Sequence, residues 1–210
     1  MSKAQNPMTG QMSGSMANFV TTTRGGQNVI RAKAFNPKDA KTEAQLKQRG
    51  GFKMVAEEYT NLGGITDEGF PEVQDGQSAY SLFMAANLSG AIDKSGTEVV
   101  IDYTKLVIAN GTLPAVIVTG ATIKPEGIEI RYQSNQKIPK VSATDELVAV
   151  AKTQLGELLL EKQVRGAEST GTILIEYPGI QVADVKGCYV FVHNADGSKA
   201  SKSVYVSLIP

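Results

Sequence analysis

The sequence predicts a mainly β protein, with a small α+β N-terminal part and an immunoglobulin-like (fibronectin III-like) β-sandwich at the C-terminus. Seven strand-like runs lie between residues 115 and 209, separated by Gly, Pro, Asn or Asp turns, and this spacing is typical of such a sandwich. Helix-capping patterns come earlier, before residue 111. The 210 residues, 41% of them hydrophobic, are enough to bury a core without metals or disulfides.

We expect the chain to have three parts. Residues 1–17 are rich in Ser, Gly, Met and Asn, which favours a flexible arm that becomes ordered only against another molecule. Residues 18–111 form the α+β domain. Residues 112–210 form the sandwich, and we expect them to fold alone because seven strands can bury two sheet faces against each other.

The α+β domain begins with a predicted β-hairpin. Two β-branched runs within residues 18–33 flank Gly25 and Gly26, a pair that favours a tight turn between strands. Thr42 then opens a capping-box pattern for a helix over residues 43–62.

Two glycines interrupt that helix pattern. Gly50 and Gly51 each cost about 1 kcal/mol relative to Ala in a helix, so we expect a neighbouring element to pack close to the backbone there. Ser78 is predicted to cap a shorter helix over residues 79–88. A strand-like run at residues 99–103 follows.

The C-terminal part shows the alternation of half-buried strands. Ile128, Ile130 and Tyr132 are predicted to share one face. In comparison with a fibronectin type III domain, Tyr189 would be the corner tyrosine, although the chain has no Trp for the usual core. The seven predicted strands lie at residues 115–123, 128–133, 146–153, 157–164, 171–177, 188–194 and 202–209.

Charge is balanced overall but not along the chain. Lys and Arg number 21, as do Asp and Glu, which argues against a general polyanion-binding protein. Residues 1–60 have nine basic and four acidic side chains, whereas residues 61–110 have seven acidic and two basic ones. Such blocks suit head-to-tail contact between copies, or contact with each other within one subunit, and both readings stay open.

The sequence offers no recognisable catalytic or metal site. Cys188 lies in an apolar run, where a thiol is most simply a buried hydrophobe. His193 has no nucleophile motif around it, so we expect a structural role. One Cys and one His cannot form a zinc site, and the glycine pairs lack the residues of a phosphate-binding loop. We therefore expect no cofactor, no metal and no enzymatic activity.

The first residues lack the apolar core of a signal peptide, and no run approaches the roughly 18 apolar residues of a membrane span. We expect a protein that is made in the cytoplasm and has no membrane contact; delivery outside as part of a larger particle stays open.

Short motifs such as Arg24-Gly25-Gly26 and Val29-Ile30-Arg31 near the front and Ser203-Val204-Tyr205 near the end resemble those of an uncharacterised, domain-of-unknown-function family of phage and prophage proteins. The resemblance spans nearly the full length and implies a virion component that contacts other virion structural proteins. The aromatic residue often found before the first arginine of such proteins is replaced here by Thr23. The shared motifs are Gly10 with Ser13 and Gly14, Arg24-Gly25-Gly26, Val29-Ile30-Arg31, Thr42 with Gln45, Gln48-Arg49, Phe52, Asp196-Gly197 and Ser203-Val204-Tyr205.

Three arginines and the turn glycines are the predicted assembly contacts. Arg24 precedes Gly25 and Gly26 at the hairpin tip, Arg31 lies on the returning strand, and Arg49 lies on the long helix. Each guanidinium can make bidentate bonds to a carboxylate. The acidic run at residues 67–75, on the same chain or the next, is the expected partner.

These observations favour a non-enzymatic structural protein, a capsid, connector or tail component that forms homo-oligomers through its N-terminal region. The alternative is a binding module of the cell-surface or carbohydrate adhesin type, or a nucleic-acid contact through the basic N-terminal block. Nucleic acid is the weaker reading, because aromatic residues make up only 6% of the chain and none is interleaved with the arginines.

Overall fold

The computed structural model describes residues 2–4, 12–35, 39, 41–134 and 138–208. The protein is mainly β, which confirms the predicted class. It divides into two compact units, Met1–Glu43 with Gln74–Gln77, and Ala44–Val73 with Ser78–Pro210.

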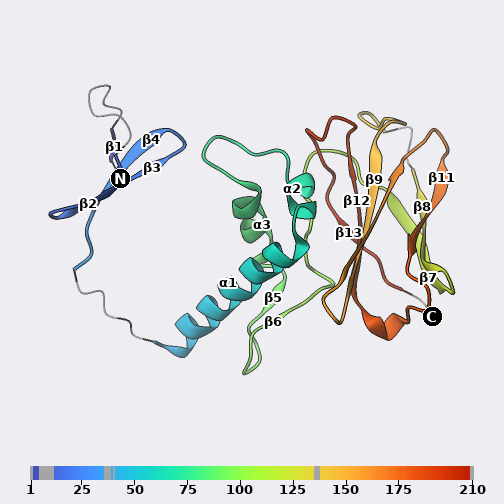
Figure 1. The fold of residues 1–210 in the computed structure, drawn as a ribbon, viewed down its shortest axis with the longest axis horizontal. Coiled ribbons are helices and arrows are strands. Elements are labelled where there is room, and N and C mark those ends of the chain that lie inside the picture. The colour runs from blue at the N-terminus through green and yellow to red at the C-terminus, as the bar shows by residue number, and fades with distance from the viewer. Residues whose placement is uncertain (1, 5–11, 36–38, 40, 135–137, 209–210) are drawn as a thin grey trace. The chain divides into compact units, whose positions relative to one another are not determined.

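The first unit has a four-stranded antiparallel sheet in the order β1-β4-β3-β2. Its strands are β1 (Ser2–Ala4), β2 (Gly14–Met16), β3 (Phe19–Arg24) and β4 (Gln27–Ala32). Figure 1 shows β3 and β4 as its central hairpin. β1 and β2 fall in the segment that we expected to be a flexible arm. They pair with the hairpin through backbone hydrogen bonds, which require no hydrophobic alternation in the sequence; residues 1 and 5–11 of the predicted arm lie outside the described residues.

The second unit begins with helices. They are α1 (Glu43–Leu62), α2 (Ile65–Gly69) and α3 (Ala79–Asn87). The predicted extent of α1 is confirmed, and it buries Gly51, Val55, Glu58 and Leu62 along one face, the spacing of a helix packed on a core. The cap predicted for α3 is also confirmed, because Ser78 Oγ accepts a hydrogen bond from Ser81 N at 3.2 Å.

A short hairpin packed against α1 explains one of its two internal glycines, Gly51. It pairs β5 (Ile92–Asp93) with β6 (Val100–Ile101). A Cβ added at Gly51 would lie 3.2 Å from Ile92 Cγ2, closer than side chains normally approach. The expected close packing at this point of the helix is therefore confirmed.

Two antiparallel sheets form the rest of the second unit, with a strand at each of the seven predicted positions; the last covers only Val204–Tyr205 of the predicted residues 202–209, of which residue 209 lies outside the described residues. One sheet has the order β10-β9-β12-β13 and the other β11-β8-β7. Between β11 and β12 the chain makes a short 3-10 helix, Val182–Asp184. The strands are β7 (Ile117–Lys124), β8 (Gly127–Gln133), β9 (Glu146–Thr153), β10 (Leu158–Val164), β11 (Thr170–Glu176), β12 (Val185–His193) and β13 (Val204–Tyr205).

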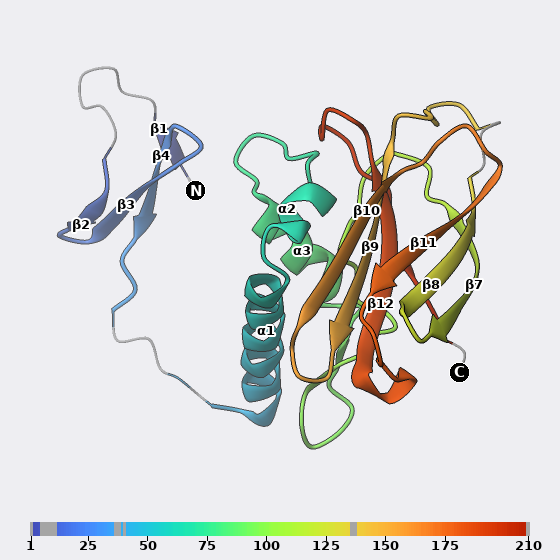
Figure 2. The same ribbon diagram turned by 45° about the vertical axis from the view of Figure 1, so that its right-hand side comes forward.

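The two central strands of the first of these sheets, β9 and β12, are buried on both faces. On one face, residues such as Leu147 and Val190 join a core with Ile128 and Ile130 of β8. On the other face, strand residues join a second core with Val55 and Leu62 of α1 and with α3. The strand residues of this second core are Val148, Val150, Tyr189 and Phe191. Figures 1 and 2 show the helices on the side of this sheet opposite β7, β8 and β11.

The predicted boundary at residues 111 and 112 therefore does not divide the two units. Residues 44–73 and 78–111 share a core with residues 112–210. Tyr189 also differs from a corner tyrosine, because its hydroxyl donates to the carbonyl oxygen of Tyr103, 86 residues earlier, at 2.6 Å. A corner tyrosine bonds a few residues upstream. Both the missing boundary at residue 111 and the bonding of Tyr189 to Tyr103 follow from the packing of the helical part on the sheet.

Candidate functional site

The β3–β4 hairpin of the first unit has a two-residue turn made by Gly25 and Gly26. Their φ angles are 56° and 73°, and the flanking Arg24 and Gln27 are paired across the strands. Two successive positive φ angles suit glycine and match the twist of the hairpin. The predicted hairpin and its turn are confirmed, and the turn holds Arg24 at the last strand position.

Arg24 and Arg31 share one face of this hairpin. Paired residues lie on the same face of a sheet, and faces alternate along each strand. The pairs on this face are Val20 with Arg31, Thr22 with Val29, and Arg24 with Gln27. Both arginines are exposed, while Val20 and Val29 are half-buried. This surface, the basic hairpin face, has an apolar middle and a guanidinium at each end.

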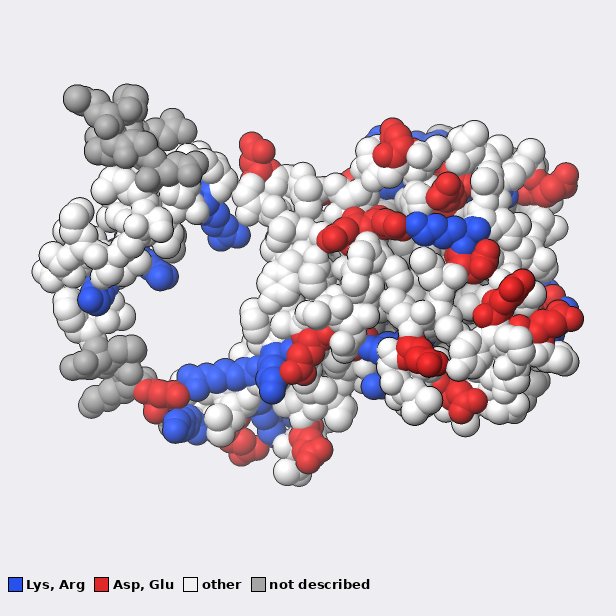
Figure 3. Space-filling view, in the orientation of Figure 1, with Lys and Arg blue, Asp and Glu red and all other residues white. Residues whose placement is uncertain are grey.

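No acidic side chain offsets this charge within the sheet. Residues 12–35 contain no Asp or Glu, and Figure 3 shows Lys and Arg without acidic residues on the visible side of the sheet, in contrast to the mixed charges of the second unit. Arg24 Nη2 donates one hydrogen bond to the carbonyl oxygen of Gly76 at 3.3 Å. The basic hairpin face is therefore suited to a negatively charged partner.

The opposite face of the same sheet has little apolar burial. Among the described residues of the first unit, the buried side chains are the polar Thr21 and Asn28. Thr23 Oγ1 and Met12 N both donate to Asn28 Oδ1, at 3.1 and 3.0 Å. Hydrogen bonds, rather than an apolar core, hold this face together.

Two large apolar side chains of that face are left exposed. Met16 and Phe19 are paired across β2 and β3, and 60% and 53% of their surfaces are exposed. A small sheet without its own apolar core is marginally stable in water. Sequence reasoning placed Phe19 in a strand but did not predict that its side chain stays exposed.

The expected acidic partner is already engaged elsewhere. In the second unit, Asp67 accepts a hydrogen bond from Tyr59, at 2.9 Å, and Glu68 pairs with Lys162, at 2.8 Å. Glu72 likewise accepts a hydrogen bond from the backbone N–H of Thr112. These three acids therefore have partners in the second unit, whereas Asp75, the fourth acid of the run at residues 67–75, lies in the first unit beside Gly76, and a contact between this run and an arginine stays a prediction.

Arg49 belongs to the other unit. It lies on α1, within the second unit. The predicted assembly contacts are thus divided between the two units: Arg24, Gly25, Gly26 and Arg31 lie in the first, and Arg49 lies in the second.

A buried charged cluster in the second unit escaped sequence reasoning. Lys152 Nζ lies 2.6 and 2.7 Å from the two carboxylate oxygens of Glu58, and both side chains are at most 5% exposed. Tyr103 Oη donates to the same carboxylate, at 3.2 Å. A carboxylate within the apolar spacing of α1 was the one available signal.

The surroundings of this cluster favour a structural role. Burial, followed by the nearby Glu58 carboxylate, raises the pKa of Tyr103 well above its ordinary value, so its hydroxyl stays protonated and keeps donating. Lys186 Nζ lies 4.7 Å from the centre of the Tyr103 ring. A surface hollow of about 250 Å³ lies over the cluster and includes Met54 and Leu155. The Lys152 amine donates hydrogen bonds to both Glu58 carboxylate oxygens, so the ion pair fixes α1 against β9.

Cys188 and His193, the two side chains considered above for reactivity, are both constrained by their surroundings. Cys188 is buried, and burial raises the pKa of its thiol to about 12, which keeps it protonated and unreactive. His193 Nδ1 lies 2.9 Å from the carbonyl oxygen of Asn194, and Nε2 lies 3.2 Å from a carboxylate oxygen of Glu146. These contacts place the imidazole at the end of β12 and support the expected structural role.

No group of three or more His, Cys, Asp or Glu side chains in the described part of the chain is placed to hold a metal ion. None of the described helices is long and apolar enough to cross a membrane.

Comparison with known proteins identifies one match. Residues 11–207 match the model of a family of unknown function, DUF6266. No curated protein and no solved structure matches the chain.

Proposed function

The chain belongs to the DUF6266 family of unknown function, and we propose that it is a non-enzymatic structural protein that associates with its own copies through the first unit. The observation that supports this proposal is the unequal construction of the two units. The second unit has two apolar cores, whereas the described buried side chains of the first are Thr21 and Asn28.

Association would supply what the first unit lacks. Covering Phe19 and Met16 would remove two large apolar side chains from water, which contributes about 1.5–3 kcal/mol for each residue fully buried. The basic hairpin face would gain acidic partners, because copies of a neutral chain must present acidic side chains elsewhere. A sheet that is marginal alone then becomes stable in the assembly.

A nucleic-acid contact is less well supported by the same geometry. Single-strand binding surfaces combine cations with aromatic rings on one platform. Here Phe19 and its cross-strand partner Ala32 lie on the face opposite to Arg24 and Arg31, because successive side chains of a strand point to opposite faces. The cations therefore have no stacking partner on their own face.

The second unit supports a more specific proposal about fold. Its seven antiparallel strands form two sheets over a common core, and we propose that they form an immunoglobulin-like sandwich. Two features depart from the usual pattern: the chain has no Trp, and helices cover the outer face of β9 and β12. The resemblance of the short motifs to phage and prophage proteins supports the further proposal that the protein is a virion component, in a capsid, a connector or a tail.

Sedimentation velocity of the full chain over a range of concentrations tests the assembly function. The double variant Arg24→Glu/Arg31→Glu should shift the protein towards monomer, and the loss should be larger at low salt. The matched control, Lys140→Glu/Lys202→Glu, changes the same number of exposed charges in the second unit and should leave association unchanged. A wild-type chain that stays monomeric at high concentration would refute the proposal, and loss of DNA binding without change in oligomers would favour nucleic acid.

A further inference from the structure

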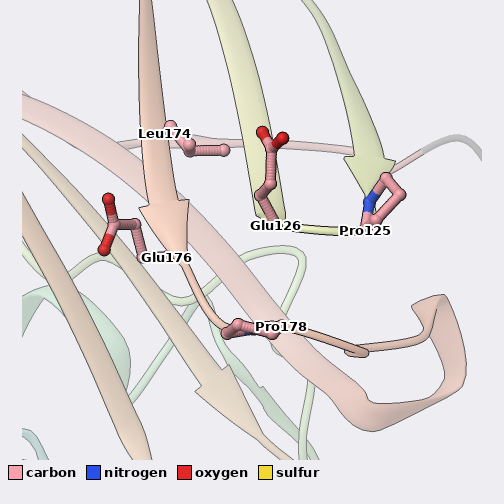
Figure 4. Close-up of a pocket in the computed structure, with 5 residues that line it drawn as sticks. All are labelled: Pro125, Glu126, Leu174, Glu176 and Pro178. Carbon is pink, nitrogen blue, oxygen red and sulfur yellow. The ribbon is translucent and has the colours of Figure 1, made fainter.

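The second unit has an apolar hollow rimmed by two carboxylates. Leu174, Pro125 and Pro178 contribute its apolar surface, and Glu126 and Glu176 stand beside it, in a volume of about 370 Å³ (Figure 4). The hollow lies where the β7–β8 turn meets the end of β11. We call it the acidic hollow.

The strand pattern explains why this hollow is apolar and open. Ile173 and Ile175 point into the core, so Leu174 between them faces outward. Glu176 is paired with Gly127 of β8, which adds no side chain of its own. The outward surface is therefore open toward Gly127, while Glu129, the direct partner of Leu174, forms an ion pair with Lys124.

The two carboxylates are available for a partner. Glu126 and Glu176 are both exposed, and among the ion pairs of the described residues neither takes part. This separates them from Asp67 and Glu68, whose partners lie in the same unit. An apolar floor with two carboxylates beside it fits an apolar surface flanked by a cation.

The basic hairpin face has that composition. Arg31 is directly paired with Val20, and Val29 lies two positions before it on β4. The valines can cover Leu174 and the prolines, while the Arg31 guanidinium, with its five N–H donors, can bond both carboxylates.

We propose that the basic hairpin face of one copy, centred on Arg31, docks on the acidic hollow of a second copy. This inference rests on the proposed assembly function and names its partner surface. The two surfaces differ, so the contact is heterologous and links copies head to tail into rings or filaments.

Two variants of the full chain test this proposal by complementation. Arg31→Glu removes the donor surface and leaves the hollow intact, whereas Glu126→Lys/Glu176→Lys does the reverse. Each alone should weaken self-association by about tenfold or more. Mixing the two brings the intact donor against the intact hollow, and the charge-reversed donor against the charge-reversed hollow, so the mixture should form the dimers and larger species that neither variant forms alone. Glu168→Lys, another exposed acid of the second unit, is the control and should assemble like the wild type.

The outcomes separate this inference from the assembly function. If Arg31→Glu abolishes assembly while Glu126→Lys/Glu176→Lys assembles normally, the first unit still mediates association but the acidic hollow is not its partner. Failure of the mixture to form dimers also overturns the inference. If a crosslink between Arg31→Cys and Glu126→Cys forms within single chains and does not fall on dilution, the two surfaces meet inside one subunit, which refutes the second copy as partner.

Discussion

Glu58 of α1 and Lys152 of β9 are 94 residues apart in sequence, yet the Lys152 amine bonds both carboxylate oxygens at 2.6 and 2.7 Å. Each side chain is at most 5% exposed. Removing one partner of such a buried pair strongly lowers the free energy of unfolding, because the remaining charge is buried without water or an opposite charge beside it. The pair therefore makes the position of the helix on the sheet specific.

Removing one charge of this pair should destabilise the second unit. We expect Lys152→Met to lower the free energy of unfolding by about 3–5 kcal/mol, measured by urea denaturation. The double variant Glu58→Leu/Lys152→Met should lose much less, since it leaves no unpaired charge. Lys162→Met, which breaks the exposed pair with Glu68, is the control and should cost less than about 1 kcal/mol. A Lys152→Met variant as stable as this control would show that the pair does not fix α1 against β9.

Residues 112–210 should not fold cooperatively without the helices. In that fragment, Val148, Val150, Tyr189 and Phe191 would lose the helical partners of their core and expose large apolar side chains. Residues 44–210 keep both cores and should melt as a cooperative unit, close to the second unit in the full chain. Circular dichroism during thermal unfolding compares the two fragments. A sharp transition in residues 112–210 alone would instead favour the independent sandwich that the sequence suggested.

The two glycines of α1 should respond differently to alanine. Gly50→Ala should raise the free energy of unfolding by up to about 1 kcal/mol, the gain in helix propensity, because the nearest neighbouring atom, Val99 Cγ2, is 3.7 Å from the added Cβ. At Gly51 the new Cβ would meet Ile92 Cγ2 at 3.2 Å, so crowding should offset the gain. Urea denaturation of the pair provides the comparison, and a larger gain at Gly51 would contradict this packing.

Stability should fall at alkaline pH. In the folded state, burial raises the pKa of Cys188 from 9.0 to about 12 and raises the pKa of Tyr103 above its ordinary value of 10.0. The unfolded chain therefore releases these protons first, so the free energy of unfolding decreases as the pH rises above about 9. Tyr103→Phe should reduce the slope above pH 10, as measured by urea denaturation between pH 8 and pH 11. An unchanged slope in this variant would exclude Tyr103 as a source.

Local sequence signals were enough for the β3–β4 hairpin, for α1 and α3, and for strands β7–β13, but not for β1, β2 or α2. Alternation of Ile128, Ile130 and Tyr132, turn residues between strands, and Gly25-Gly26 in the hairpin each act within a few residues, so the strands of the second unit and the hairpin of the first were predictable. The length of α1 was predictable for the same reason, because helix spacing and the glycine pair at its end are local.

By itself the sequence determined the mainly β class, the order of the elements that it predicted and the basic character of the hairpin. Tertiary structure decided which surfaces meet: that Val148 and Tyr189 face helices while Leu147 and Cys188 face a second sheet, and that Glu58 meets Lys152. Backbone periodicity depends on neighbours two to four residues away, whereas burial of a face and pairing of a charge depend on chain segments that only folding brings together.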